Sequence, residues 1–422
     1  MRVLIVGSGG REHALAWKIR QSPRVERLFI APGNGGTALE GENVAVDVDD
    51  IPGLVKLART KKVDLVIVGP ELPLVLGLTD ALEKENILCF GPGAYPAQLE
   101  GSKAFAKSLM SQAEVPTAGY RVFEDFNQAV KYVQGRDFPV VIKADGLAAG
   151  KGVVVAEDFE EAREALDDML VKQVFGKAGD RVVIEEALSG EEASFLALCD
   201  GRDFLLLPSS QDHKRIGEND TGPNTGGMGA YSPAAVLPAS KYQETADLVI
   251  RPMLQHLEQT DQPFKGVLYA GLIFSEDGPR VLEYNVRFGD PECQPLLMRM
   301  DSDLLEVIMA CVHGRAGEKK LQVRHEACVC VVLSAGGYPG KYAKGHEIAG
   351  IEEAETDPLV KVFHAGTTYK DGGLVTSGGR VLGVTALGED LKDAIERCYR
   401  AVEKISFEGM YYRRDIGQKG LQ

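Results

Sequence analysis

The segment 143–153 holds the residues of this sequence that are best suited to bind phosphate groups. Lys143 and Lys151 supply positive charge, and three glycines let the backbone approach a ligand closely and turn its N–H groups inward. These glycines are Gly146, Gly150 and Gly152. The Walker A pattern G-x-x-x-x-G-K-[ST] does not fit, because three residues separate Gly146 from Gly150 and because Gly152 stands where the pattern requires a hydroxyl. An ordinary glycine-rich hairpin tip with exposed lysines is the alternative interpretation.

Short apolar runs flank this segment on both sides. Residues 139–142 are predicted to form one strand and residues 153–156 a second one. The sequence therefore predicts a strand–loop–strand flap over phosphates, in contrast to the strand–loop–helix of a Walker A site.

An alternating run further along the chain has the residue types of a metal site. In 281–287 every second residue is polar, so Glu283, Asn285 and Arg287 are expected on one face of a strand. A carboxylate and an amide oxygen at positions i and i+2, together with substrate phosphates, suit Mg²⁺. A polar outer strand face is the alternative, but it does not explain why the run continues into another polar turn, 288–292.

Acidic residues follow the predicted strand near 181–186. Backbone groups of the hinge after Glu185 and Glu186, as far as Leu188, can read the edge of an adenine base, and Glu192 can accept hydrogen bonds from ribose hydroxyls. A solvated acidic turn explains the same residues equally well.

The stretch 211–233 has almost no apolar periodicity and is predicted to be a long irregular loop. A loop of this length in a compact domain is usually functional or disordered, and its mixture of charges and glycines favours binding. Asp212, Lys214, Asn224 and Gly226 are its candidate site residues. His213 is more consistent with a hydrogen-bonding scaffold residue than with a proton-transfer group.

The first strand is followed by a glycine turn that resembles a dinucleotide-binding loop only in part. Gly7 and Gly9 fit the pattern, but Glu12 replaces the third glycine, and the second strand does not end in an acidic residue. NAD binding is therefore not expected, although the turn and the helix N-terminus can receive one phosphate.

Composition excludes several classes of partner. The chain has 422 residues and a formal net charge of −15, so we expect neither a nucleic acid nor a membrane as its partner. It has no cleavable apolar leader and no run of about 18 apolar residues, which predicts a cytoplasmic location. Seven cysteines without framework spacing predict reduced thiols. Cys328 and Cys330 are expected to be buried in a strand rather than to bind metal.

The order of predicted elements indicates a multidomain α/β and α+β protein. Four short apolar strands, near 2–6, 28–30, 65–68 and 88–90, each precede a Gly/Pro loop and predict a parallel sheet within residues 1–119. Residues 120–190 are predicted to form a lid that contains the flap. Residues 191–325 form a further unit with helices near 240–259 and 301–313, and residues 326–422 form a final α+β unit.

Taken in order, these motifs resemble the phosphoribosylamine–glycine ligase family of the ATP-grasp superfamily. The motifs that carry the resemblance are 7–13, 32–36, 69–71, 99–103, 143–153, 211–233, 282–292 and Thr376 to Arg380. The resemblance implies a Rossmann-like N-terminal domain, a two-part ATP-grasp that clamps the nucleotide between sheets, and a small C-terminal α+β domain that closes the site.

The resemblance also implies roles for individual residues. ATP is expected to contact Lys107, Lys143, Gly146, Gly150, Lys151, Gly152, Glu185, Glu186, Leu188 and Glu192. Glu283 and Asn285 are expected to bind Mg²⁺ or Mn²⁺. Phosphoribosylamine and glycine are expected to face Gly9, Gly10, Gly33, Asn34, Gly35, Glu71, Asp212, Asn224, Gly226 and Arg287, with Asp212, Lys214 and Arg287 in the catalytic group. Many ATP-grasp enzymes carry a further metal-binding acid about twelve residues before the position of Glu283, where this chain has Gly271.

The resemblance implies ATP-dependent ligation of glycine to 5-phospho-β-D-ribosylamine in purine biosynthesis. Because no side chain stands in a convincing nucleophile–base arrangement, the glycine carboxylate itself is expected to be activated as glycyl phosphate. The chain is expected to be a monomer that can contact the neighbouring enzyme of the pathway transiently. A different ATP-grasp ligase or carboxylase, and a nucleotide-sensing protein without turnover, are the alternatives.

Overall fold

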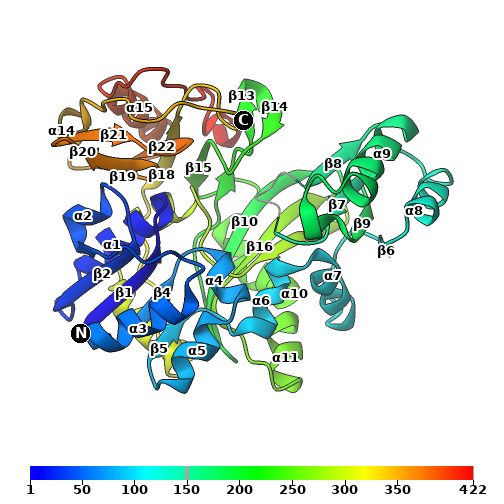
Figure 1. The fold of residues 1–422 in the computed structure, drawn as a ribbon, viewed down its shortest axis with the longest axis horizontal. Helices are drawn as coiled ribbons and strands as arrows, with labels where there is room; N and C mark the ends of the chain where they lie inside the picture. The colour runs from blue at the N-terminus through cyan, green and yellow to red at the C-terminus, as the bar shows by residue number, and fades with distance from the viewer. Residues whose placement is uncertain (148–151, 422) are drawn as a thin grey trace.

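The computed structural model describes residues 1–147 and 152–421. The N-terminal and C-terminal parts of the chain lie one above the other, and a lid projects from the central part (Figure 1). None of the helices in the described residues is both long and apolar enough to span a membrane.

A five-stranded parallel sheet forms the N-terminal part, as the glycine-terminated strands predict. Its order is β3-β2-β1-β4-β5, and every neighbouring pair is parallel. The edge strand β3 is too short to be recognised from an apolar run. The strands are β1 Arg2–Gly7, β2 Arg27–Pro32, β3 Glu42–Asn43, β4 Leu65–Val68 and β5 Leu88–Phe90. The helices are α1 Gly10–Arg20, α2 Thr37–Glu40, α3 Ile51–Lys61, α4 Glu71–Val75, α5 Leu78–Lys84, α6 Ala94–Gly101 and α7 Lys103–Gln112.

The lid is a four-stranded antiparallel sheet of order β6-β9-β7-β8 that helices cover. It has an apolar core of its own, which includes Ile142, Leu166 and Ile184. Its elements are β6 Tyr120–Phe123, α8 Phe126–Val133, β7 Val140–Ala144, β8 Val153–Ala156, α9 Phe159–Leu166 and β9 Val182–Glu186. Because β7 pairs directly with β8, the predicted strand–loop–strand arrangement is confirmed.

A second antiparallel sheet, of order β11-β10-β16-β17, forms the central part. Its core is continuous with that of the N-terminal sheet, since Val66, Leu268 and Tyr284 belong to one apolar cluster. The elements are β10 Glu191–Asp200, β11 Phe204–Leu206, α10 Tyr242–Val249, α11 Arg251–Gln259, β16 Lys265–Ser275, β17 Gly278–Asn285, α12 Cys293–Met298 and α13 Leu304–Val312. The single helix predicted over 240–259 is wrong: it is divided at Ile250, because Pro252 lies in the first turn of α11 and starts a new helix.

The prediction of an irregular loop over 211–233 is also wrong. The stretch contains β12 Gln211–Asp212, β13 Arg215–Gly217, β14 Thr221–Asn224 and β15 Gly229–Ser232. β13 pairs with β14 as a hairpin, and β15 pairs with β18 of the C-terminal sheet. Strands of two to four residues are too short to show an alternating pattern, so the sequence gives no signal for them.

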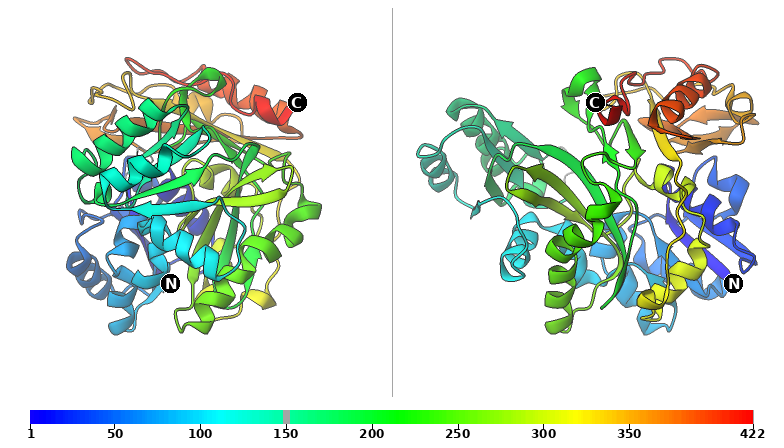
Figure 2. Two further views of the ribbon diagram at one scale, coloured as in Figure 1. Left: turned by 90° about the vertical axis from the view of Figure 1, so that its right-hand side faces the viewer. Right: turned by 180° about the vertical axis from the view of Figure 1, so that it is seen from behind.

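The C-terminal part is built around a sheet of order β12-β15-β18-β22-β19, against which α15 packs (Figure 2). Its elements are β18 Ala327–Ser334, α14 Ile351–Ala354, β19 Val360–His364, β20 Thr367–Lys370, β21 Gly373–Thr376, β22 Arg380–Gly388 and α15 Leu391–Val402. Cys328 and Cys330 are fully buried in β18, which confirms that part of the prediction, and all seven cysteines are free and buried.

Two buried histidines join the N-terminal part to the C-terminal part. Nδ1 of His13 accepts a hydrogen bond of 2.8 Å from the backbone N–H of His364, and the Asn34 side chain donates to the carbonyl of His364 at 2.9 Å. Burial lowers the pKa of His13. Burial, with smaller contributions from His13 and Lys361, lowers the pKa of His364 to about 3. Both rings are therefore neutral at this contact.

The histidine contact predicts acid sensitivity. In the unfolded chain both histidines take up protons below about pH 6.5, so their stabilising contribution is complete above that pH and is lost as the pH falls towards the lowered pKa of the folded state. The free energy of urea unfolding should fall between about pH 6.5 and 5 by up to 1.4 kcal/mol per pH unit for each histidine. His364→Asn should reduce this slope, whereas the control His256→Gln should not. Equal slopes in wild type and His364→Asn would contradict the prediction.

Candidate active site

Two lysines from different elements meet one buried carboxylate. Lys107 Nζ on α7 lies 2.8 Å from Glu185 Oε2, and Lys143 Nζ on β7 lies 2.9 Å from Glu185 Oε1. The Glu185 side chain, on β9, is only 2% exposed. Burial lowers the pKa of Lys107, and the charge of Glu185 offsets part of this effect. Two ammonium groups fixed at one place can stabilise charge on phosphate oxygens.

The first residues of the predicted flap, Asp145 and Gly146, lie against the N-terminus of α7. Asp145 accepts hydrogen bonds of 2.9 Å from Ser102 Oγ and from the Ala104 N–H, and one of 2.6 Å from Arg181 Nε. Lys103 donates to the carbonyl of Gly146 at 3.1 Å. At the other end of the flap, the Gly152 carbonyl accepts a hydrogen bond of 2.8 Å from the Ala144 N–H. Gly150 and Lys151 lie outside the described residues.

Glu283 on β17 has the properties of a metal ligand. Within the described residues its carboxylate makes no hydrogen bond or ion pair, and it lies opposite Gly271 on β16. Burial opposes its ionisation, but Lys214, Lys143 and Lys103 lower the pKa of Glu283 below its ordinary value. It is therefore an ionised carboxylate that lies beside cations without a direct partner.

Asn285 supplies a second oxygen beside it, and its Oδ1 accepts from Arg287 at 3.2 Å. No group of three or more His, Cys, Asp or Glu side chains in the described residues is arranged to hold a metal. One carboxylate and one amide oxygen still fit Mg²⁺, because this ion commonly takes one or two protein oxygens and completes its shell with water and substrate phosphates.

Further charged groups from the stretch 211–233 lie close to Glu283. Lys214 Nζ pairs with Glu192 Oε2 at 2.6 Å. Burial opposes the charged form of Lys214, but Glu192 and Asp212 raise its pKa. Burial raises the pKa of Asp212 to about 7, although Lys214 opposes this shift. Glu292, which the sequence does not single out as a site residue, is buried nearby and accepts from Tyr269 Oη at 2.5 Å.

Arg287 lies between two carboxylates. It contacts Glu100 Oε1 at 2.7 Å and Glu71 Oε2 at 3.4 Å. The structure thus brings together Glu71 and Arg287, two of the residues for which the resemblance implies substrate binding. Glu100 is missed by the sequence analysis, although the motif 99–103 contains it. Burial raises the pKa of Glu100 to about 7, although Arg287 opposes the shift.

The predicted adenine-binding segment lies between β9 and β10. Glu186 Oε1 accepts from the Gly119 N–H at 2.9 Å and from Arg280 at 3.2 Å, so its side chain ties the lid to the central sheet. Leu188 is half-buried in the connection between the two strands. The backbone of this connection remains the predicted adenine contact.

The glycine loops predicted to face phosphoribosylamine and glycine lie where the N-terminal and C-terminal parts meet. Gly9 N donates to Glu12 Oε2 at 2.6 Å, Gly33 N to the Gly7 carbonyl at 3.1 Å, and Gly35 N to the Thr367 carbonyl at 3.1 Å. Gly10 is the first residue of α1, and Asn224 is the last of β14. Because the N–H groups of Gly9, Gly33 and Gly35 are used within the protein, a substrate would have to contact other atoms of these loops.

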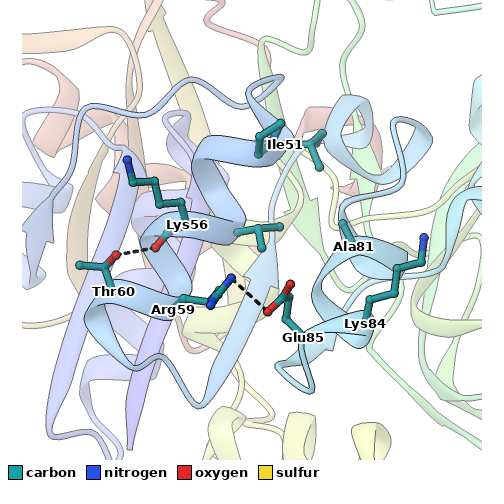
Figure 3. Close-up of a pocket in the computed structure, with 9 residues that line it drawn as sticks. Ile51, Lys56, Arg59, Thr60, Ala81, Lys84 and Glu85 are labelled. Atoms are coloured by element: carbon teal, nitrogen blue, oxygen red, sulfur yellow. Dashed lines mark hydrogen bonds and ion pairs between the residues drawn. The ribbon is translucent and has the colours of Figure 1, made fainter.

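A separate cavity of 770 Å³ lies on the surface between α3 and α5 (Figure 3). Ile51, Val55 and Ala81 contribute apolar side chains to it, and an Arg59–Glu85 ion pair of 3.4 Å lies at its edge. None of the predicted site residues lines this cavity.

The fold and the paired lysines define an ATP-grasp enzyme, and comparisons with known proteins agree. Domain models described as phosphoribosylglycinamide synthetase match the chain in three parts: the N domain at residues 1–100, the ATP-grasp (A) domain at 101–293 and the C domain at 328–419. The chain belongs to the phosphoribosylglycinamide synthetase family.

Individual relatives are similar over the full length. A Vibrio parahaemolyticus protein named phosphoribosylamine–glycine ligase is 51% identical over 100% of this chain and 99% of its own. The crystal structure of the phosphoribosylamine–glycine ligase from Thermotoga maritima has a TM-score of 0.86 at 34% identity and covers 98% of this chain and 100% of its own. A Campylobacter jejuni biotin carboxylase has a TM-score of 0.76 at 15% identity, covering 99% of this chain and 94% of its own, which shows likeness of fold alone.

Glu283→Gln should abolish ADP formation and leave the fold intact. The substitution removes the carboxylate charge of the predicted metal site without creating a cavity, and loss of metal-ion stabilisation should lower kcat by a factor of about 100 or more. Asp277→Asn, at an exposed turn of the same hairpin, serves as the control and should keep turnover close to wild type.

Steady-state ADP release and thermal unfolding would be measured for both variants. Near-normal turnover of Glu283→Gln at saturating Mg²⁺ would show that the metal assignment is wrong.

Proposed function

We propose that this protein joins glycine to 5-phospho-β-D-ribosylamine and forms glycinamide ribonucleotide, ADP and phosphate, a step of purine biosynthesis. The observation that carries this function is the similarity to phosphoribosylamine–glycine ligases over the full length of the chain, at 51% identity for the Vibrio parahaemolyticus relative. The cluster formed by Lys107, Lys143 and Glu185, together with the ionised carboxylate of Glu283, supplies the groups that phosphoryl transfer requires.

The reaction we propose has two steps on the substrate itself. An oxygen of the glycine carboxylate attacks the γ-phosphorus of ATP, and ADP leaves. The amine of phosphoribosylamine then attacks the carbonyl carbon of glycyl phosphate, phosphate leaves with one glycine oxygen, and the amine loses a proton. Holding both reactants together away from water lowers the barrier for the second step.

The side chains support activation of the substrate rather than of the protein. Burial raises the pKa of Cys330 and of Cys311 to about 12, so these thiols remain protonated. His213 is buried, neither of its ring nitrogens has a partner among the described residues, and burial lowers its pKa to about 4. No activated nucleophile of this kind is available in the described residues.

The chain's own groups then have separate tasks. Lys107 and Lys143 would hold phosphate oxygens, and Glu185 keeps their ammonium groups in place. Arg287, fixed by Glu71 and Glu100, would hold a substrate carboxylate or phosphate. Mg²⁺ or Mn²⁺ at Glu283 and Asn285 would neutralise charge on the transferring phosphoryl group.

The nucleotide, the metal, the cellular location, the oligomeric state, the contact with another enzyme and the domain bounds are also proposals. ATP is the nucleotide, and Mg²⁺ or Mn²⁺ is the metal. The enzyme is cytoplasmic and monomeric, and it can contact the neighbouring enzyme of the pathway transiently. Its domains span residues 1–119, 120–190, 191–325 and 326–422.

Labelled glycine tests the proposed path. Glycine with ¹⁸O in its carboxylate should transfer one labelled oxygen to inorganic phosphate in each turnover, because the oxygen that attacks ATP leaves with the phosphate. The label would be measured by mass spectrometry of the released phosphate, with ¹⁸O-water and unlabelled glycine as the control. Unlabelled phosphate from labelled glycine, or a trapped phosphorylated protein, would refute the acyl-phosphate path.

A further inference from the structure

Arg380 is the first residue of β22 and ends the motif 376–380, to which the sequence assigns no role. Its NH1 donates to the carbonyl of Gly226 at 2.5 Å, to that of Asp290 at 2.6 Å and to that of Gly227 at 3.4 Å. Its NH2 lies 3.5 Å from Asp290 Oδ2. One guanidinium group from the C-terminal part therefore binds two separate loops of the central part.

The loop that contains Gly226 and Gly227 packs closely against Arg380 on one side and Pro291 on the other. A Cβ atom on Gly226 would lie 3.0 Å from Arg380 Cζ. Gly227 has a φ of +109°, and a Cβ atom there would lie 2.5 Å from Pro291 Cδ. On the other side of the loop, the Gly226 N–H donates to Tyr338 Oη at 3.0 Å. Arg380 and Tyr338 together fix both peptide groups of Gly226.

The second contact of Arg380 reaches the N-terminal part. Asp290 Oδ2 accepts from the Arg11 N–H in the first turn of α1 at 3.3 Å, and Gln294 Nε2 donates to Asp290 Oδ1 at 2.9 Å. A Cβ atom on Gly9 would lie 3.1 Å from Asp290 Oδ2. Asp290 therefore stands between Arg380 and the loop formed by Gly9 and Gly10.

We propose that Arg380 is a positioning residue for phosphoribosylamine. Three segments contact its guanidinium directly or through Asp290: the loop of Gly226, the turn that follows Arg287, and the loop of Gly9. Gly226, Arg287 and Gly9 belong to the group of residues predicted to face phosphoribosylamine and glycine. NH1 of Arg380 donates to protein carbonyls and its NH2 lies beside Asp290 Oδ2, so the role that these contacts support is to hold the three segments in place. The inference rests on the proposed function for the identity of the substrate, but the geometry of the contact is independent of it.

The test compares Arg380→Ala and Arg380→Lys with the control Arg299→Ala. Arg299 is buried, whereas Arg380 is partly exposed; Arg299 donates to the Glu326 carbonyl and to Ser232 Oγ, both at 2.7 Å, but it touches none of the three segments. Arg380→Ala should raise the KM for phosphoribosylamine about tenfold or more and leave the KM for ATP within about twofold. Added guanidinium ion should restore part of the loss. Arg380→Lys keeps the charge without the planar fork and should give an intermediate KM.

The control Arg299→Ala and a measurement of amide hydrogen exchange separate a positioning role from a general loss of stability. Arg299→Ala should lower the melting temperature without changing the KM for phosphoribosylamine. In the substrate-free protein, the amides of Gly226 and Gly227 should exchange hydrogen faster in Arg380→Ala than in wild type. An unchanged KM for phosphoribosylamine in Arg380→Ala, or an equal rise in Arg299→Ala, would overturn the proposal.

The two proposals fail in different ways. If wild-type protein forms no ADP with glycine and phosphoribosylamine, the proposed function is wrong, and the amide exchange of Gly226 and Gly227 alone decides the positioning role. If Arg380→Ala does not fold, Arg380→Lys carries the same comparison, and an Arg380→Lys variant with wild-type KM and exchange would contradict the proposal.

Discussion

The buried carboxylate of Glu185 between two ammonium groups is the interaction on which the site depends. Taking three charges out of water is costly, and the geometry compensates for this only while every charge keeps its partner. The side chains of Lys107 and Lys143 come from α7 and β7, so the carboxylate also fixes the helix against the lid sheet. If these two cations bind phosphate as proposed, they are already fixed in place before the nucleotide arrives, which lowers the ordering cost of binding.

The surrounding contacts extend this constraint. Asp145 joins the flap to the N-terminus of α7, Glu186 joins β9 to Arg280 of the central sheet, and Arg287 is held between Glu71 and Glu100. In each case a charged side chain of one part pairs with a group of another part. The site therefore lies where the N-terminal part, the lid and the central part meet. Glu283 differs from these groups, because within the described residues its carboxylate has no hydrogen-bond or ion-pair partner, although Lys214, Lys143 and Lys103 lower its pKa.

Local patterns in the sequence predicted the elements but not the contacts between them. The glycine-terminated strands of the N-terminal sheet and the two strands of the flap are confirmed, because apolar runs and glycines are local signals. The pairing of Glu185 with two lysines, and the positions of Glu100, Glu292 and Arg380, depend on residues far apart in the chain. The short strands within 211–233 were missed because their partners, and not their own residues, define them.

Dependence of ADP release on its substrates tests the central claim most directly. ADP would be measured with ATP, Mg²⁺ and freshly prepared phosphoribosylamine, with glycine present, omitted or replaced by bicarbonate. The account predicts sustained ADP formation only when glycine and phosphoribosylamine are both present, in equal amount to the glycinamide ribonucleotide formed. ADP formation that bicarbonate supports in place of glycine would indicate a carboxylase, and no ADP formation with both substrates would indicate a binding protein without turnover; either result would contradict the account.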